Sequence, residues 1–119
     1  WSGTGAVIKV SWLPASLDAV LALVAEGGGA GAPMELNGRA GIGTGLLRVD
    51  AEAAMQIDVV RRLRDHRALF SQVTILRAAP GVKAAVDVWG GTRDTAALQA
   101  AVKRAFDPAG ILNAGRGPW

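Results

Sequence analysis

Residues 34–49 read MELNGRAGIGTGLLRV, two runs of strand-like composition that flank a glycine-rich centre. Asn-Gly between extended runs is a strong hairpin signal, so a tight turn at Asn37–Gly38 is one interpretation. A turn near Gly41–Gly43 is the other, and it pairs residues 34–39 with residues 44–49. We favour this second turn because the chain after it ends in a clear apolar–polar–apolar alternation, as a strand does.

A strand and a helix precede this hairpin. Residues 5–12 (GAVIKVSW) alternate in the manner of a strand with one buried side. After Pro14, the apolar side chains of residues 17–24 recur at helical spacing. We expect this helix to end at Gly27–Gly29, because glycine tolerates the left-handed conformation that often follows a helix.

A second helix and a further strand come after the hairpin. Asp50 is a natural N-cap for a helix over residues 51–66. Residues 70–77 form a β-rich run, which Ala79-Pro80-Gly81 breaks. Residues 82–89 are then either a short extension of that strand or a loop.

The last predicted element is a helix from Asp94 to Phe106. Its inner stripe is predicted to consist of Leu98, Val102 and Ala105–Phe106. Asp107–Pro108 ends the helix, because proline lacks the amide proton and disfavours helix in the residue before it.

The order strand, helix, strand, strand, helix, strand, tail helix predicts an α+β fold. It is the split β-α-β-β-α-β pattern of a ferredoxin-like sandwich with an antiparallel sheet. We expect one domain over residues 1–106 and a tail over residues 107–119. Two helices then cover one face of the sheet, and the opposite face is left to solvent or to a partner.

Composition excludes several classes of site. The 119 residues include no cysteine and a single histidine, His66, so we expect no metal site and exclude most catalytic triads. With no tyrosine and two phenylalanines, the chain lacks the aromatic platform of RNA-binding sheets, and we expect no nucleic-acid partner. No run approaches the ~20 apolar residues that span a bilayer, and no signal peptide is evident. We therefore expect a cytoplasmic protein without a membrane span.

Two further motifs have structural interpretations. Residues 27–32 formally match G-x-G-x-x-A, but they follow a helix and precede a strand, so we interpret them as a helix terminator with a loop. A basic cluster closes the second predicted helix. Its cations favour the negative end of the helix dipole, although an anion-binding or docking surface stays open as an alternative. The cluster consists of Arg61, Arg62, Arg64, His66 and Arg67.

The C-terminal segment Phe106–Arg116, FDPAGILNAGR, resembles a known family signature. FAD-linked oxidases of the vanillyl-alcohol oxidase type end in a helix followed by (F/L)-D-P-x-G-I-L-N-P-G-(R/K). Ala114 stands where that family usually has proline, which loosens the turn. The upstream order of elements is similar to the cap domain of these proteins, most of all to the E subunit of bacterial glycolate oxidase and its close relatives.

The resemblance implies that the chain is the C-terminal, substrate-side part of a longer flavoprotein. FAD would be bound mainly by an N-terminal domain outside this chain, with Asn113, Gly115 and Arg116 on the cofactor side and Ile111–Leu112 at the domain junction. The full enzyme would oxidise a small 2-hydroxy acid such as glycolate and pass electrons onward, with oxidase subunits as further partners. No catalytic residue is expected in this chain, which would be inactive alone.

Two residues near the hairpin, Arg39 and Arg48, are candidates to hold the substrate carboxylate through bidentate contacts. Two alternatives stay open. The tail can be a simple latch packed on this domain itself. The chain can also be a ferredoxin-like regulatory or interaction module that binds a small ligand or self-associates through its sheet.

Overall fold

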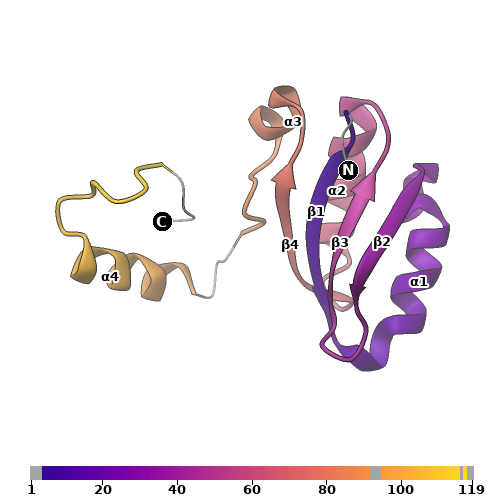
Figure 1. Cartoon of the computed structure of the whole chain (residues 1–119), viewed down its shortest axis with the longest axis horizontal. Coiled ribbons are helices and arrows are strands. Elements are labelled where there is room, and N and C mark those ends of the chain that lie inside the picture. The colour runs from indigo at the N-terminus through magenta and orange to yellow at the C-terminus, as the bar shows by residue number, and fades with distance from the viewer. Residues whose placement is uncertain (1–3, 92–94, 116, 118–119) are drawn as a thin grey trace.

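The computed structural model describes residues 4–91, 95–115 and 117. Four antiparallel strands form one open sheet in the order β2-β3-β1-β4. The strands are β1 (Ala6–Trp12), β2 (Met34–Arg39), β3 (Thr44–Val49) and β4 (Phe70–Arg77); the helices are α1 (Leu17–Ala25), α2 (Ala53–Asp65), α3 (Pro80–Ala85) and α4 (Ala96–Phe106). The α+β class and the split β-α-β-β-α-β order are confirmed (Figure 1).

The hairpin has the turn that we favoured. Arg39 pairs with Thr44, so the chain reverses over residues 40–43 rather than at Asn37–Gly38. Gly43 closes the turn at φ 70°, and a Cβ atom there would collide with the main-chain oxygen of Trp12. This position therefore requires glycine, both for its conformation and for its close approach to β1.

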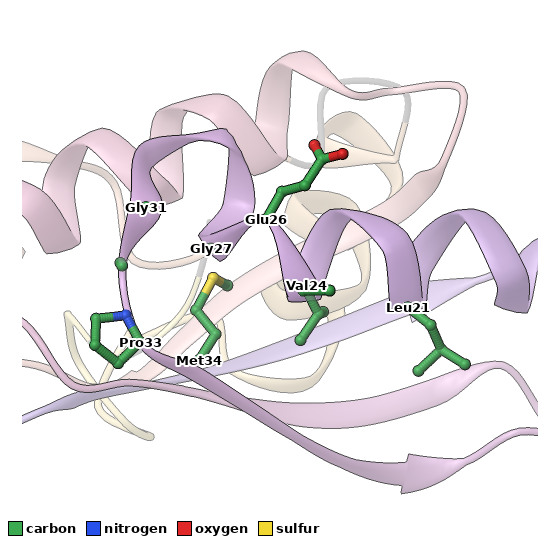
Figure 2. Close-up of a pocket in the computed structure, with 9 residues that line it drawn as sticks. Leu21, Val24, Glu26, Gly27, Gly31, Pro33 and Met34 are labelled. Atoms are coloured by element: carbon green, nitrogen blue, oxygen red, sulfur yellow. The ribbon is translucent and has the colours of Figure 1, made fainter.

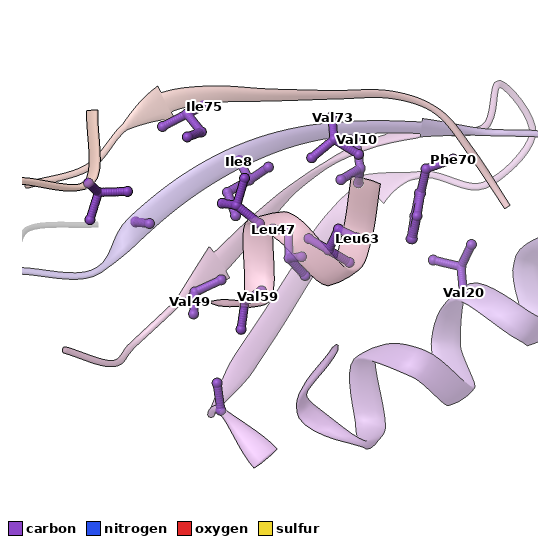
Figure 3. Packing of buried hydrophobic residues seen from close by; sticks show 14 of the residues in the cluster. Ile8, Val10, Val20, Leu47, Val49, Val59, Leu63, Phe70, Val73 and Ile75 are labelled. Atoms are coloured by element: carbon purple, nitrogen blue, oxygen red, sulfur yellow. The ribbon is translucent and has the colours of Figure 1, made fainter. Parts of the chain in front are cut away.

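One face of the sheet carries the core, and α1 and α2 cover it. Alternate residues of β1 and β3, among them Ile8, Val10 and Leu47, are buried against these helices (Figure 3). α2 contributes Val59, Val60 and Leu63 to the cluster, and α1 contributes Val20. The apolar side chains on one side of the strands thus pack against the apolar stripes of the two helices in a single layer.

The predicted start of the second helix is wrong. α2 begins at Ala53 with Glu52 as its N-cap residue, and that cap makes no side-chain hydrogen bond. The carboxylate of Asp50 instead accepts a hydrogen bond from Arg48 at 3.0 Å. Asp50 directly follows β3, and its amide donates to the carbonyl oxygen of Pro33 across the hairpin at 3.0 Å.

Residues 80–85 form a helix that the sequence analysis did not predict. Pro80 occupies the first turn of α3, where its missing amide proton costs no helical hydrogen bond. Val82 anchors the short helix in the core. The following residues run along β4, and Ile75 donates its amide to Val88 at 2.8 Å. The strand does end at Arg77, as predicted from Ala79-Pro80-Gly81, and Pro80 in addition starts a new helix.

α4 and the C-terminal loop lie outside the sandwich (Figure 1). The helix ends at Phe106, as predicted from Asp107–Pro108, whereas the predicted start at Asp94 lies outside the described residues. The predicted inner stripe is wrong, because no residue of α4 is buried and Leu98, Val102 and Phe106 are exposed. The helix is amphipathic, but its apolar face does not pack on the sheet.

Candidate functional site

The face of the sheet that α1 and α2 do not cover is mostly polar, although Val7 and Thr74 on it are buried. Its central strand β1 presents Val7, Lys9 and Ser11, and the side chains beside them follow from the strand register. Lys9 lies between Leu46 of β3 and Thr74 of β4, and it is exposed at the centre of this face. We call this surface the open face; its members are Val7, Lys9, Ser11, Glu35, Asn37, Arg39, Thr44, Leu46, Arg48, Gln72, Thr74 and Arg77.

Both arginines predicted to hold a carboxylate lie on the open face, but the structure does not bring them together. Arg48 pairs with Glu35 in the strand register, whereas Arg39 pairs with Thr44. Four residues along β3 separate these pairs, a distance of about 13 Å in a strand. Arg48 also points away from Arg39, because its Nη2 binds the carboxylate of Asp50 at 3.0 Å. A single small carboxylate therefore contacts at most one of the two.

A buried carboxylate organises the C-terminal loop. Asp107 follows α4, and its two oxygens accept the amide protons of Ile111 at 3.0 Å and of Leu112 at 2.9 Å. Lys103, one helical turn earlier, donates both to this carboxylate and to the carbonyl oxygen of Leu112. The side chain of Asp107 thus satisfies amides of a loop that has no regular secondary structure. We call this arrangement the Asp107 hub.

The electrostatics of the hub favour the charged form of the carboxyl group. The hydrogen bond from Lys103 lowers the pKa of Asp107, and the amides of Leu112 and Ile111 lower it further, although loss of hydration opposes them. The hub is therefore fully formed at neutral pH.

The loop held by the hub presents apolar side chains outward. Ile111 in the loop is 77% exposed, and Phe106 at the end of α4 is 82% exposed. Together with the exposed stripe of α4, the loop borders a hollow of about 450 Å³. Its lining includes Leu98, Val102, Phe106 and Leu112. Exposed apolar side chains gathered in this way mark an interaction surface.

The residues assigned to the cofactor side lie beyond the hub. Asn113 has φ 50°, a left-handed conformation that asparagine tolerates better than most residues, and its side chain is exposed. Gly115 adopts φ 69° with open space around it. Arg116 lies outside the described residues. The described positions offer hydrogen bonds at the edge of a ligand and no cradle for a whole dinucleotide.

No family model, curated protein or solved structure matches this chain. The assignment of function therefore depends on the geometry described above and on the resemblance of the C-terminal segment. Across the described ranges, no helix combines the length and the apolar character that crossing a membrane requires.

Two residues of the basic cluster at the end of α2 are engaged within the fold. Arg62 forms an ion pair with Asp58 at 2.8 Å. Arg64 donates to the carbonyl oxygens of Val73 and Asp87. The cluster is thus partly a structural clamp. The glycine run that precedes β2 forms the turn Gly27–Gly31 at the end of α1, as expected of a helix terminator.

Two features of the surface were missed from the sequence. Asp107 was interpreted only as part of a helix stop, although the Asp-Pro pair followed by a glycine is also compatible with a carboxylate that caps later amides. One face of the sheet was expected to stay uncovered, but the position of Lys9 at the centre of that face depends on the strand order β2-β3-β1-β4, which no local pattern displays.

Proposed function

We propose that this chain is the substrate-side domain of an FAD-dependent oxidoreductase of the vanillyl-alcohol oxidase type, similar to the glycolate oxidase E subunit. The observation that carries the proposal is the apolar surface of α4 and the C-terminal loop. Phe106 at the end of α4 and Ile111 and Leu112 in the loop are more than half exposed, and the ion pair of Lys103 with the buried carboxylate of Asp107 holds the loop in shape. A fixed apolar surface of this kind suits a second domain packed against it.

In this proposal the N-terminal domain of the same protein binds most of the FAD and packs on the loop. Asn113 and Gly115 lie just beyond the Asp107 hub, where they can donate hydrogen bonds to an edge of the cofactor. When bound, the flavin would supply the redox chemistry of hydride removal from the α-carbon of a small 2-hydroxy acid, and this chain would bind and orient that acid. The protein is proposed to act in the cytoplasm, with further oxidase subunits as partners.

The open face would then form the wall of the substrate site. Arg48 is the better placed of the two predicted arginines, because it lies on an inner strand and diagonal to Lys9. Arg39 lies on the edge strand β2, at the rim of the sheet. We therefore assign the substrate carboxylate to Arg48, whose guanidinium can bind it while keeping one bond to Asp50.

The test compares this chain with the protein encoded by the whole reading frame that contains it. The longer protein should purify with the visible absorbance of oxidised flavin and should oxidise glycolate or a related 2-hydroxy acid. The chain alone should show neither. Stoichiometric FAD on the chain alone, or a reading frame without a flavin-binding domain, would overturn the proposal.

Matched variants locate the contact. Leu112→Ser in the longer protein should lower flavin retention, whereas Leu13→Ser, at a leucine before α1 that is also more than half exposed, should not. Arg48→Ala should raise KM for the hydroxy acid by about tenfold or more, and Arg39→Ala should leave it unchanged. Equal effects of the two serine variants would remove the reason for placing the domain junction at the loop.

The alternative is a ferredoxin-like interaction module that binds a ligand or self-associates through the open face. Lys9 lies at the centre of that face and is exposed. Under the alternative, Lys9→Glu changes ligand binding or association of the isolated chain. Under the flavoprotein proposal, the same substitution acts only in the longer protein.

A further inference from the structure

The outer edge of β2 has free main-chain groups. Within the described part of the chain, β2 pairs with β3 alone, and no other strand adjoins it. The hydrogen bond from Asp50 to Pro33 fixes which residues of β2 turn their amides toward β3. Residues whose main-chain groups point toward β3 alternate with residues whose groups point away from it. Pro33, Glu35, Asn37 and Arg39 therefore point theirs toward β3, and Leu36 and Gly38 turn their N–H and C=O groups outward. The opposite edge differs, since the segment after α3 hydrogen-bonds to β4.

The side chains on this edge are self-complementary. Glu35, Asn37 and Arg39 are exposed on the open face, with Asn37 midway between opposite charges. When two β2 strands pair antiparallel about Asn37, Glu35 of each copy lies opposite Arg39 of the other. These are non-hydrogen-bonded positions, where facing side chains approach most closely. Two ion pairs form by symmetry, and no like charges meet.

We infer that β2 is a self-pairing edge, through which a second copy of this chain extends the sheet from four strands to eight. A charged residue on an edge strand commonly protects against such pairing. Here the charges of opposite sign are placed symmetrically, so they select one register of pairing. The inference concerns the rim of the sheet and is independent of the proposed flavin chemistry.

The helical side of the edge carries an apolar groove. A groove of about 490 Å³ lies between the end of α1 and the start of β2, bordered by Leu21, Val24 and Met34 (Figure 2). Leu21 is half exposed there. In the paired arrangement Leu36 faces Gly38 of the second copy, whose missing side chain leaves room for it. The grooves of the two copies then lie at opposite ends of the paired strands, because Met34 of each copy lies opposite Ala40 of the other.

The association state of the full chain tests the inference. Light scattering and sedimentation over a micromolar to millimolar series should show a monomer–dimer equilibrium. Glu35→Arg and Arg39→Glu should each raise the dimer dissociation constant by about tenfold, because each creates two like-charge pairs. The double variant Glu35→Arg/Arg39→Glu should recover the wild-type value, and a mixture of the two single variants should form a heterodimer.

Lys9→Glu is the matched control, since it reverses an exposed charge on the same face but away from the edge. It should not change dimerisation. Glu35 also lies opposite Arg48 within the chain, so the Tm of each variant checks that the fold persists. A chain that stays monomeric throughout the series overturns the inference. So does a dimer that neither single reversal weakens, or one that Phe106→Ser abolishes while both reversals leave it intact.

Discussion

Arg64 donates a hydrogen bond from Nη2 to the carbonyl oxygen of Asp87 at 2.5 Å, and so ties the end of α2 to the segment that follows α3. The same nitrogen lies 3.3 Å from the carbonyl oxygen of Val73 in β4. The carboxylate of Asp87 in turn accepts the amides of Trp89 and Gly91, both at 3.1 Å. One arginine thus joins a helix, a strand and a loop that are distant in sequence.

Replacement of Arg64 is expected to destabilise the sandwich. Arg64→Ala leaves partly buried carbonyl oxygens without their donor, which costs about 1–3 kcal/mol of unfolding free energy. Arg61→Ala, on the exposed side of the same helix, should stay within about 0.5 kcal/mol. Urea denaturation of both variants measures the difference. Equal stability of the two would mean that the Arg64 bonds contribute nothing to the fold.

Most of the sandwich was predictable because its signals are local. The alternation in residues 5–12 and the apolar spacing in residues 17–24 each specify one element, and Gly27 ends the first helix. The hairpin register followed once the glycine-rich turn was placed over residues 40–43. These patterns depend on neighbours within a few residues, which a sequence displays directly.

The failures have long-range or competing causes. Aspartate is a common residue at helix N-caps, but the carboxylate of Asp50 is bound by Arg48 on the same strand face. The stripe of α4 has the period of a core-facing helix, but a period does not state which surface the stripe contacts. The partners of Arg64 lie 9 and 23 residues away. No local pattern connects residues at such separations.

Gly43 should be among the least replaceable residues of the hairpin. Gly43→Ala imposes a side chain at φ 70° and against the main chain of Trp12, which is expected to cost about 1–3 kcal/mol. Gly41 lies in the same turn with a negative φ and open space around it. Gly41→Ala should therefore be neutral or stabilise by about 0.4–1 kcal/mol. Thermal melts of the two variants measure the difference in stability. Comparable losses of stability in both variants would contradict the turn geometry.

Asp107→Asn should loosen the C-terminal loop without unfolding the sandwich. The carboxamide has one acceptor oxygen where the carboxylate has two, and it loses the charge that holds Lys103. Hydrogen exchange of the Ile111 and Leu112 amides should become several-fold faster, while exchange of Val10 in β1 stays the same. Asp65→Asn, an exposed carboxylate at the end of α2, serves as the control. Unchanged exchange in the Asp107 variant would show that the hub does not order the loop.

The same hub predicts a response to acid. The pKa of Asp107 is lowered in the folded loop by Lys103 and by two amides, so the carboxylate stabilises the loop above the ordinary carboxyl pKa, about 3.9. This contribution is lost as pH falls through the lowered pKa, because protonation removes the acceptor. NMR shifts of the Ile111 and Leu112 amides should stay constant down to about pH 4 and change below it. A change at neutral pH would contradict the assignment.

Leucines in the core and on the surface of α4 should respond differently to truncation. Leu63 of α2 is fully buried in the sandwich, so Leu63→Ala should cost about 2–5 kcal/mol through lost burial and a cavity. Leu98 of α4 has the same chemistry but is 66% exposed, so Leu98→Ala should stay within about 0.5 kcal/mol in this chain. If Leu98→Ala instead lowers the Tm as much as Leu63→Ala, α4 packs on the sandwich in solution. The apolar surface that we assign to a flavin-binding domain would then be occupied by the chain itself.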